Sequence, residues 1–212
     1  MLKDVDIREP LFDFLEEKYG KIRIFEEKNI GKSRADAIMI TDGNLFGIEI
    51  KSDADTYQRL ERQVKDYDIF GDYNYVVVGS THATHIREHV PDYWGIISVE
   101  EVENGVDFYM MREPKKNKQV SLRCQMSFLW RFELAHIQEK NNMYKYAYKS
   151  KVFVIDKIID TVERELLKQQ MTDELFERDY TTVADKINEY RKEHNQKPRR
   201  KKKYKKRRKV IV

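Results

Sequence analysis

Two carboxylates and a lysine are spaced along the chain so that a β-hairpin would bring them together. Asp36 lies in residues 33–40, where apolar and polar side chains alternate with the period of a strand. Glu49 and Lys51 lie in a second alternating segment, residues 45–51. These two residues are two positions apart, so they share one face of their strand. The sequence therefore predicts three ionisable groups on one face of a sheet.

The segment between the two strands decides which of these residues face each other. Asp-Gly between two alternating segments is the strongest short-range signal for a hairpin. If residues 42–43 form a two-residue loop, Asp36 stands opposite Glu49. If residues 43–44 form the loop, Asp36 stands opposite Lys51. Both registers place Asp36 beside the other two residues.

This arrangement has a chemical consequence. Carboxylates that face each other across two strands have Cβ atoms roughly 4.5–5.5 Å apart, and they repel each other. A hard divalent cation would remove the repulsion, and Mg²⁺ is often held by one or two carboxylates together with water and substrate phosphate. A nearby lysine can orient an attacking water and stabilise charge on the phosphate. Asp36, Glu49 and Lys51 thus have the composition needed to hydrolyse a phosphodiester bond with a metal ion.

The pattern Asp36…Glu49-Ile50-Lys51 resembles the core of the PD-(D/E)XK nuclease superfamily. Ala35 stands where the superfamily's name has proline, a position that tolerates other residues. Within the superfamily, roughly residues 3–135 are similar to a branch of small, largely uncharacterised bacterial and phage proteins. The segments that carry this similarity are residues 47–56, Arg59-Leu60, Gln63, residues 90–97, Trp130-Arg131 and Glu133-Leu134.

The resemblance implies a fold, a cofactor and a set of functional residues. The fold is α/β, with helices flanking a mixed β-sheet as in the core of restriction endonucleases. The activity is that of a nuclease that depends on Mg²⁺ or Mn²⁺. The metal ligands implied are Asp36, Glu49, the carbonyl of Ile50 and Glu26, and the catalytic residues implied are Asp36, Glu49, Lys51 and Gln63.

Several of the expected site residues have a plain structural alternative. Gln63 and Tyr67 are four apart on an expected helix, where several nuclease branches carry a Gln-x-x-x-Tyr pair near the metal; otherwise Tyr67 packs in the core and Gln63 lies at the surface. Glu26 ends the first expected strand, where the alternative is a solvated charge. Lys32 and Arg34 flank the start of the first hairpin strand. We expect them to contact nucleic-acid phosphates, with ordinary surface charge as the alternative.

The periodicity predicts a core with helices on both sides of a sheet, followed by a helical region. We expect a core over residues 1–115, a helical extension over residues 116–196 and a disordered basic tail over residues 197–212. The expected strands are 21–26, 33–40, 45–51, 73–79, 93–99 and 106–111. The expected helices are 4–19, 56–70, 82–90, 121–140, 151–170, 172–178 and 181–194.

The charge of the chain is distributed unevenly. The 212 residues include 41 Lys and Arg and 37 Asp and Glu, a net charge of +4. Eleven of the basic residues follow Gln196 and no acidic residue follows Glu193, so residues 1–196 carry 30 basic and 37 acidic side chains, a net charge of −7. A block of like charges repels itself, so we predict a nucleic-acid-binding arm, with an aid to solubility as the alternative. The eleven residues are Lys197, Arg199, Arg200, Lys201, Lys202, Lys203, Lys205, Lys206, Arg207, Arg208 and Lys209.

The sequence argues against several classes of protein. Cys124 is the only cysteine, so neither a disulfide framework nor a cysteine-based zinc site can form within one chain. No apolar signal region begins the chain, and no run approaches the 18 apolar residues of a membrane span. We therefore expect a cytoplasmic protein with no membrane partner. His82, His85 and His89 could share one helix face, but we expect a partly exposed helix there rather than a zinc site.

These observations together favour a metal-dependent deoxyribonuclease. We expect an endonuclease that acts on nicked, branched or single-stranded DNA, because no ATPase motor accompanies the site. RNA is an alternative substrate, and a dimer is compatible with the sequence. Two other functions are compatible with the same sequence features. One is a module of the same fold that has lost catalysis and only binds nucleic acid, and the other is an interaction protein whose acidic body scaffolds an assembly.

Truncation after Gln196 tests the role of the tail. It removes eleven cations from a body of net charge −7, so we expect DNA binding to weaken strongly at low salt. If the tail neutralises about six phosphates, the log affinity of the full chain should fall with log salt at a slope near −5. The truncated chain should show a flatter slope in anisotropy titrations and should cut saturating substrate within a few-fold of the full-length rate. An unchanged affinity and slope would contradict this role.

Overall fold

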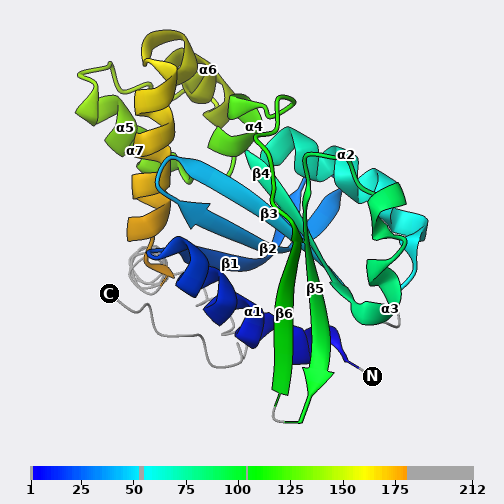
Figure 1. The fold of residues 1–212 in the computed structure, drawn as a ribbon. Coiled ribbons are helices and arrows are strands. Elements are labelled where there is room, and N and C mark those ends of the chain that lie inside the picture. The colour runs from blue at the N-terminus through cyan, green and yellow to red at the C-terminus, as the bar shows by residue number, and fades with distance from the viewer. Residues whose placement is uncertain (1, 53–54, 104, 181–212) are drawn as a thin grey trace, which may run out of the picture. The chain divides into compact units, whose positions relative to one another are not determined.

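The computed structural model describes residues 2–52, 55–103 and 105–180. Its centre is a mixed β-sheet with helices on its faces (Figure 1). The strands follow one another across the sheet in chain order: β1 (Arg23–Ile30), β2 (Ser33–Thr41), β3 (Asn44–Lys51), β4 (Tyr73–Gly79), β5 (Gly95–Val102) and β6 (Gly105–Arg112). β1 to β3 are antiparallel, β3 to β5 are parallel, and β6 is antiparallel to β5. The α/β fold with a mixed sheet, expected from the sequence, is confirmed.

The helices precede, connect and follow the strands. Parallel neighbours need crossover connections, which here contain a helix after β3 and two short helical turns after β4. The connecting elements are η1 (Tyr57–Arg59), α2 (Leu60–Phe70), α3 (Ser80–Ala83) and η2 (Ile86–Glu88). α1 (Asp4–Tyr19) precedes the sheet, and the helices after it are α4 (Leu122–Met126), α5 (Arg131–Lys140), α6 (Lys151–Thr161) and α7 (Arg164–Glu177).

Residues 82–90 do not form the single helix that the sequence predicted. They contain the end of α3 and then η2. The His85 N–H donates to the His82 carbonyl, and the His89 N–H donates to the Ile86 carbonyl, so each bond joins residues three positions apart. Such bonds are those of a 3₁₀-helix, which is short and tightly wound. The three histidines therefore do not share one helix face.

Two longer expected helices are each divided by a carboxylate that starts a new helix. Residues 121–140 are divided into α4 and α5, because the Glu133 side chain accepts a hydrogen bond from the Trp130 N–H at 2.6 Å. Residues 151–170 are divided into α6 and α7, because the Glu163 side chain accepts from the N–H three residues further on at 2.9 Å. Carboxylates at these positions satisfy free backbone N–H groups and favour a helix N-terminus. α7 runs without a break from Arg164 to Glu177, so it joins the end of the expected helix 151–170 to the expected helix 172–178.

The β2–β3 hairpin has the first of the two registers considered. Thr41 pairs with Asn44, and four further pairs follow in the same register. Gly43 has a φ of 67°, in the left-handed region that a two-residue hairpin turn requires. If this register is continued by one residue on each strand, Glu49 lies opposite Asp36.

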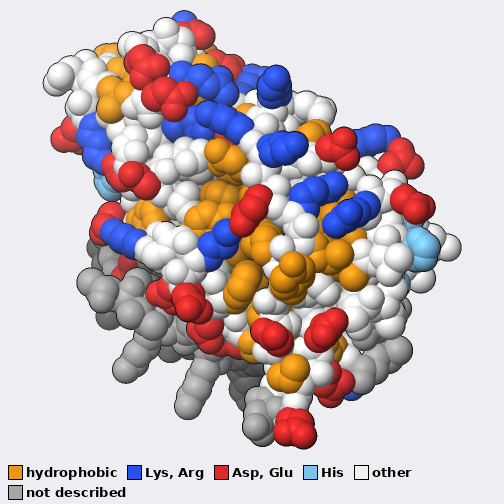
Figure 2. All heavy atoms as spheres, viewed as in Figure 1, with side chains coloured by type: hydrophobic (Ala, Val, Ile, Leu, Met, Phe, Trp, Pro, Cys, Tyr) orange, Lys and Arg blue, Asp and Glu red, His pale blue; other side chains and the backbone are white. Residues whose placement is uncertain are grey.

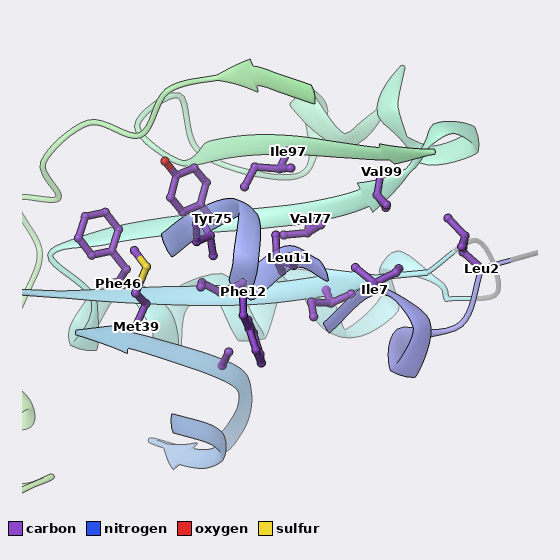
Figure 3. Close-up of a cluster of buried hydrophobic side chains, with 14 residues drawn as sticks. Leu2, Ile7, Leu11, Phe12, Met39, Phe46, Tyr75, Val77, Ile97 and Val99 are labelled. Atoms are coloured by element: carbon purple, nitrogen blue, oxygen red, sulfur yellow. The ribbon is translucent and has the colours of Figure 1, made fainter. Parts of the chain in front are cut away.

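α1 covers one face of the sheet (Figure 3). Figure 3 shows Ile7, Leu11 and Phe12 of α1 close to strand side chains that include Met39 and Val77. Full burial of such a side chain contributes about 1.5–3 kcal/mol. The apolar spacing along α1 thereby fixes this helix against the middle strands.

α2 covers the opposite face, and it packs directly on β3. Tyr67 of α2 is fully buried. A Cβ atom added at Gly47 would lie only 2.4 Å from Cδ1 of the Tyr67 ring, so glycine is the residue that permits this approach. The Tyr67 hydroxyl then lies 3.0 Å from the backbone carbonyl of Ile48 on β3.

A buried polar network joins the helices after β6 to the sheet. Asp72, between α2 and β4, is fully buried and accepts hydrogen bonds from the Leu45 N–H at 3.0 Å and from the Gln125 side chain at 2.8 Å. Asp72 also forms an ion pair with Lys168 of α7. Both ions of this pair are almost without solvent contact, so the network holds the helices in one defined position.

Met1–Leu175 form one compact unit, and Phe176–Val212 are grouped separately. The predicted division into residues 1–115, 116–196 and 197–212 stays a prediction. The expected helix over residues 181–194 and the tail lie outside the described residues. Among the described residues, the model contains no helix with the length and apolarity that a membrane crossing requires.

Gly47→Ala should lower the free energy of unfolding by about 1–3 kcal/mol, because the added methyl group overpacks the contact with Tyr67 and Asn74. Urea unfolding followed by circular dichroism measures this loss. Tyr67→Leu removes the ring that the methyl group meets. The two losses should therefore be less than additive in the double variant. Full additivity would show that Gly47 does not act through Tyr67.

Candidate active site

Glu49 and Lys51 lie on β3 and face α2. They are only 1% and 3% exposed, and the Lys51 Nζ atom lies 2.6 Å from Glu49 Oε1. Gln63 of α2 joins this pair. Its Oε1 accepts a hydrogen bond from Lys51 Nζ at 3.1 Å, and its Nε2 donates to Glu49 Oε1 at 2.5 Å. A buried ion pair needs such bonds to offset its loss of water, and Gln63 supplies one to each ion.

The hydroxyl group of Tyr67 joins three backbone segments at the site. It lies 2.8 Å from Glu49 Oε2 and 3.0 Å from the Ile48 carbonyl, and it accepts a hydrogen bond from the Asp36 N–H at 3.2 Å. Burial, followed by the charges of Glu49 and Asp36, raises the pKa of Tyr67 well above its ordinary value. The hydroxyl therefore stays protonated and keeps α2, β2 and β3 together at this point.

β2 and β3 separate at Asp36. Their antiparallel pairing ends with Ala37 and Ile48. At the next residue of β2, the Asp36 N–H donates to the Tyr67 hydroxyl, and the Asp36 carboxylate replaces a backbone carbonyl as the acceptor for β3. Its Oδ2 accepts the N–H of Ile50 at 2.8 Å. The side chain of Asp36 is thus held against β3, next to the strand residues that carry Glu49 and Lys51.

Arg8 of α1 reaches the same aspartate from the other side. Its guanidinium donates to the Asp36 carbonyl at 3.0 Å and lies 3.4 Å from Asp36 Oδ1. The same group contacts Asp4 at 2.7 Å, Glu27 at 2.7 Å and Glu26 at 3.4 Å. Arg8 therefore balances a group of four carboxylates at the edge of the site.

Arg8 was not among the residues that the sequence predicted at the site. Asp4 and Arg8 are four apart on α1, a spacing visible in the sequence, but such pairs are common on helix surfaces. Nothing in the local sequence places α1 beside β2. The position of Arg8 follows from the packing of α1 on the sheet, which is a tertiary feature.

The electrostatics of Asp36 reflect both its burial and its neighbours. Burial and then the charge of Glu49 raise the pKa of Asp36 to about 7, although the Ile50 N–H and Arg8 act in the opposite direction. The two carboxylates are therefore close enough to repel each other. Protonation of Asp36 makes its carboxyl group neutral and relieves this repulsion in the metal-free protein.

The oxygen atoms of the site suit a hard cation. A carboxylate has about four acceptor positions. Glu49 uses three of them within the network described above, and Asp36 uses two, so both keep capacity for an oxygen-seeking ion such as Mg²⁺. Within residues 2–52, 55–103 and 105–180, no three His, Cys, Asp or Glu side chains gather into a metal site. An ion at this position would therefore depend on two carboxylates.

Other residues expected at the site lie at its margin. Glu26 contacts Arg8, and its side chain is 48% exposed. Lys32 is exposed in the turn between β1 and β2. The Arg34 guanidinium lies 2.6 Å from a carboxylate oxygen of Glu27, which offsets part of its charge. The basic residues expected to bind nucleic acid from Lys197 onward lie outside the described residues.

The three histidines that we weighed as zinc ligands do not converge. The ring of Tyr57 stacks on His89 at a centroid distance of 4.1 Å and meets His82 edge-on at 5.0 Å. His85 lies apart from both rings and is 3.8 Å from Glu88.

Comparison with known proteins assigns the chain to a family. Residues 2–203 match the family model described as Bacteriophage P4 protein cII. The chain belongs to this family. A structure of SfsA from Pyrococcus furiosus in complex with Ca²⁺ is a distant likeness, with 16% sequence identity and a TM-score of 0.33. The match covers 53% of this chain and 61% of the SfsA chain, less than two thirds of that protein. It assigns no function to this chain, and the curated proteins contain no significant match.

The metal-free protein should lose stability as Asp36 ionises. Its pKa is about 7 in the fold against an ordinary value of 3.8, so the fold prefers the neutral carboxyl group. This contribution is present below pH 4 and is lost as pH rises through 7. In EDTA, the free energy of unfolding measured with urea should fall between pH 5 and pH 8. The fall should be smaller for Asp36→Asn, which cannot ionise, than for the wild type. Equal losses in both proteins would contradict the assignment.

Proposed function

We propose that this protein is a metal-dependent nuclease of the PD-(D/E)XK type that hydrolyses phosphodiester bonds in DNA. One observation carries the proposal. Asp36 and Glu49 are held on one face of the sheet by Tyr67 and by the Ile50 N–H, with the Lys51 ammonium beside Glu49. A purely structural role would not require two repelling carboxylates and a buried lysine at the point where two strands separate.

The metal would be Mg²⁺ or Mn²⁺, held by Asp36, Glu49 and the carbonyl of Ile50. The raised pKa of Asp36 supports this assignment, because a carboxylate pair that repels itself in the metal-free protein gains most from a cation. When bound, such an ion lowers the pKa of a water ligand and stabilises charge on the phosphate. Glu26, the further ligand expected from the resemblance, is too exposed in this arrangement to support that role.

Lys51 is the group that we assign to the attacking water and the phosphate. Its ammonium has three N–H donors, and the contacts with Glu49 and Gln63 use two of them. The third can hold a water or a phosphate oxygen. Because Lys51 is 3% exposed, its charge acts with little screening by solvent.

Gln63 and Tyr67 keep Glu49 in place. Their side chains donate to its two different oxygens, Gln63 to Oε1 and Tyr67 to Oε2, so the carboxylate cannot rotate freely. Preorganised donors of this kind reduce the rearrangement needed during reaction. We assign Gln63 and Tyr67 as positioning residues.

DNA is the substrate that we favour, with cleavage inside a nicked, branched or single-stranded region. The basic tail supports a polyanionic substrate, and the described residues include no recognisable motor that would drive processive cleavage from an end. RNA carries the same phosphates and is the alternative that a substrate panel separates.

A nucleic-acid-binding module without catalysis is the second candidate. The observation in its favour is that each site carboxylate already has a cation, Lys51 for Glu49 and Arg8 for Asp36. Such pairs could stabilise the fold by themselves. This candidate predicts binding to DNA without cleavage in any divalent metal.

Cleavage assays with site variants distinguish these functions. Asp36→Asn, Glu49→Gln and Lys51→Met should each lower the cleavage rate at least 10²-fold, on the order of 3 kcal/mol of transition-state stabilisation. EDTA should abolish cleavage, and Mg²⁺ or Mn²⁺ should restore it. Plasmid, single-stranded and branched DNA, with an RNA of the same sequence, form the substrate panel.

The matched control is Glu61→Gln, which removes an exposed carboxylate of α2 outside the site. It should cut at the wild-type rate. If wild-type protein binds the panel but cuts no member of it with either metal, the nuclease assignment is wrong and the binding module is correct. A Lys51→Met variant with full activity would remove the role given to that lysine.

A further inference from the structure

A basic groove lies between the segment that follows β6 and the start of α7. Its volume is about 320 Å³. Four cations and two carboxylates line it, which gives a formal charge of +2. These residues are Lys116, Lys118, Arg164 and Lys168, with Asp72 and Glu165.

Three of the cations are free to meet an anion. Lys116, Lys118 and Arg164 are exposed, and no other described residue forms a hydrogen bond or ion pair with their side chains. Lys18, by contrast, is an exposed cation that forms an ion pair with Glu113. The groove thus presents positive charge that the protein itself does not neutralise.

The base of the groove is rigid. Lys168 and Asp72 form a buried ion pair there, with side chains 4% and 0% exposed. Asn117 donates to the carbonyls of Asp68 at 2.6 Å and Gly71 at 2.8 Å, which fixes the segment after β6 against the end of α2. Cations carried on fixed backbone lose less conformational freedom when they bind a ligand.

The pairing of β3 with β4 gives the separation, measured along the strands, between Asp72 at the base of the groove and the candidate active site. Glu49 is opposite Val76 of β4, and Lys51 is opposite Val78. Asp72 precedes these positions by four and six residues, which at about 3.3 Å per residue is roughly 13–20 Å along the strand. Phosphates of one DNA strand advance about 3.4 Å per nucleotide along the axis. The separation therefore matches about four to six nucleotides.

The groove is part of a wider positive region. Figure 2 shows Lys and Arg side chains gathered on the upper part of this face, around α6, α7 and the segment that leads to α4. Asp and Glu side chains are more frequent at its lower end, near α1 and the β5–β6 hairpin. Because residues 1–196 carry a net charge of −7, a local positive region decides where a polyanion can approach this part of the chain.

We propose that this groove binds the phosphate backbone of a nucleic acid about four to six nucleotides from the phosphate at the Asp36/Glu49/Lys51 site. The inference rests on the proposed function for its substrate class. It assigns a separate binding site to the residues that line the groove. The groove contacts carry no sequence information, because phosphates are the same at every position. They hold the strand at a fixed distance from the reacting phosphate and in a fixed direction across the protein.

Binding measured without cleavage tests the groove. The full-length protein is titrated in EDTA against a fluorescent 20-base-pair duplex, at several salt concentrations, by anisotropy. The variant that combines Lys116→Gln, Lys118→Gln and Arg164→Gln should bind at least tenfold more weakly at about 100 mM salt. If each of the three side chains contacts one phosphate, its slope of log affinity against log salt should be shallower by about 2.7, since each phosphate contact contributes roughly −0.9.

Two control proteins separate local from global charge. One combines Lys3→Gln, Lys18→Gln and Lys140→Gln, which removes the same charge from the residue before α1, from α1 and from α5, outside the residues that line the groove. It should lose no more than about twofold in affinity. The other is Glu165→Gln, which removes a groove carboxylate and should bind a few-fold more tightly. Thermal unfolding should show that all variants are folded.

The outcomes are distinct from those of the cleavage assays. Equal losses in the groove variant and the matched charge control, or wild-type binding by the groove variant, overturn the inference even if the protein is a nuclease. Selective loss of binding by the groove variant supports the groove. If this loss occurs in a protein that cuts nothing with either metal, the groove stands and the nuclease assignment fails.

Discussion

The hydroxyl group of Tyr67 is the contact on which the candidate active site depends. It meets the backbone of β2 at Asp36, the backbone of β3 at Ile48 and the carboxylate of Glu49, and it is carried by α2. This position is available only because Gly47 has no side chain to hold the ring away from the sheet. The distance between helix and strand, and with it the spacing of the site residues, is therefore set by one glycine and one phenol.

Three carboxylates that are buried or largely buried each have a cation as partner. Glu49 has Lys51 and Gln63, Asp36 has Arg8, and Asp72 has Lys168. Removing charges from water costs several kcal/mol per ion, so such pairs add little to stability by themselves. They do specify one arrangement of the elements, because α1, α2 and α7 must each bring the correct partner. The pair at Asp72 fixes the helices after β6, and the pairs at Asp36 and Glu49 fix the site.

Local sequence was sufficient for the hairpin and insufficient for its surroundings. The Asp-Gly turn and the two alternating strands predicted the hairpin and limited it to two registers. The structure has the first of these, and that register accounts for the position of Asp36 next to Glu49. The helix that carries Gln63 was also visible, since its apolar spacing is regular. Arg8 was not, because its role depends on α1 packing across the sheet. The breaks in the later helices were also not predicted. The carboxylates of Glu133 and Glu163 accept backbone N–H groups and start new helices, and the apolar periodicity of the sequence contains no sign of this.

The path of α1 across the sheet has a consequence for a newly synthesised chain. The apolar face of this helix is completed by Ile97 and Val99 of β5, although the helix itself is made first. Until β5 has left the ribosome, α1 lacks the part of its core that Ile97 and Val99 supply. The packing of α1 that holds Arg8 beside Asp36 is therefore not complete before that point. The site is completed late in biosynthesis, and a chain that stops before β5 would leave the apolar face of α1 open to chaperones or to aggregation.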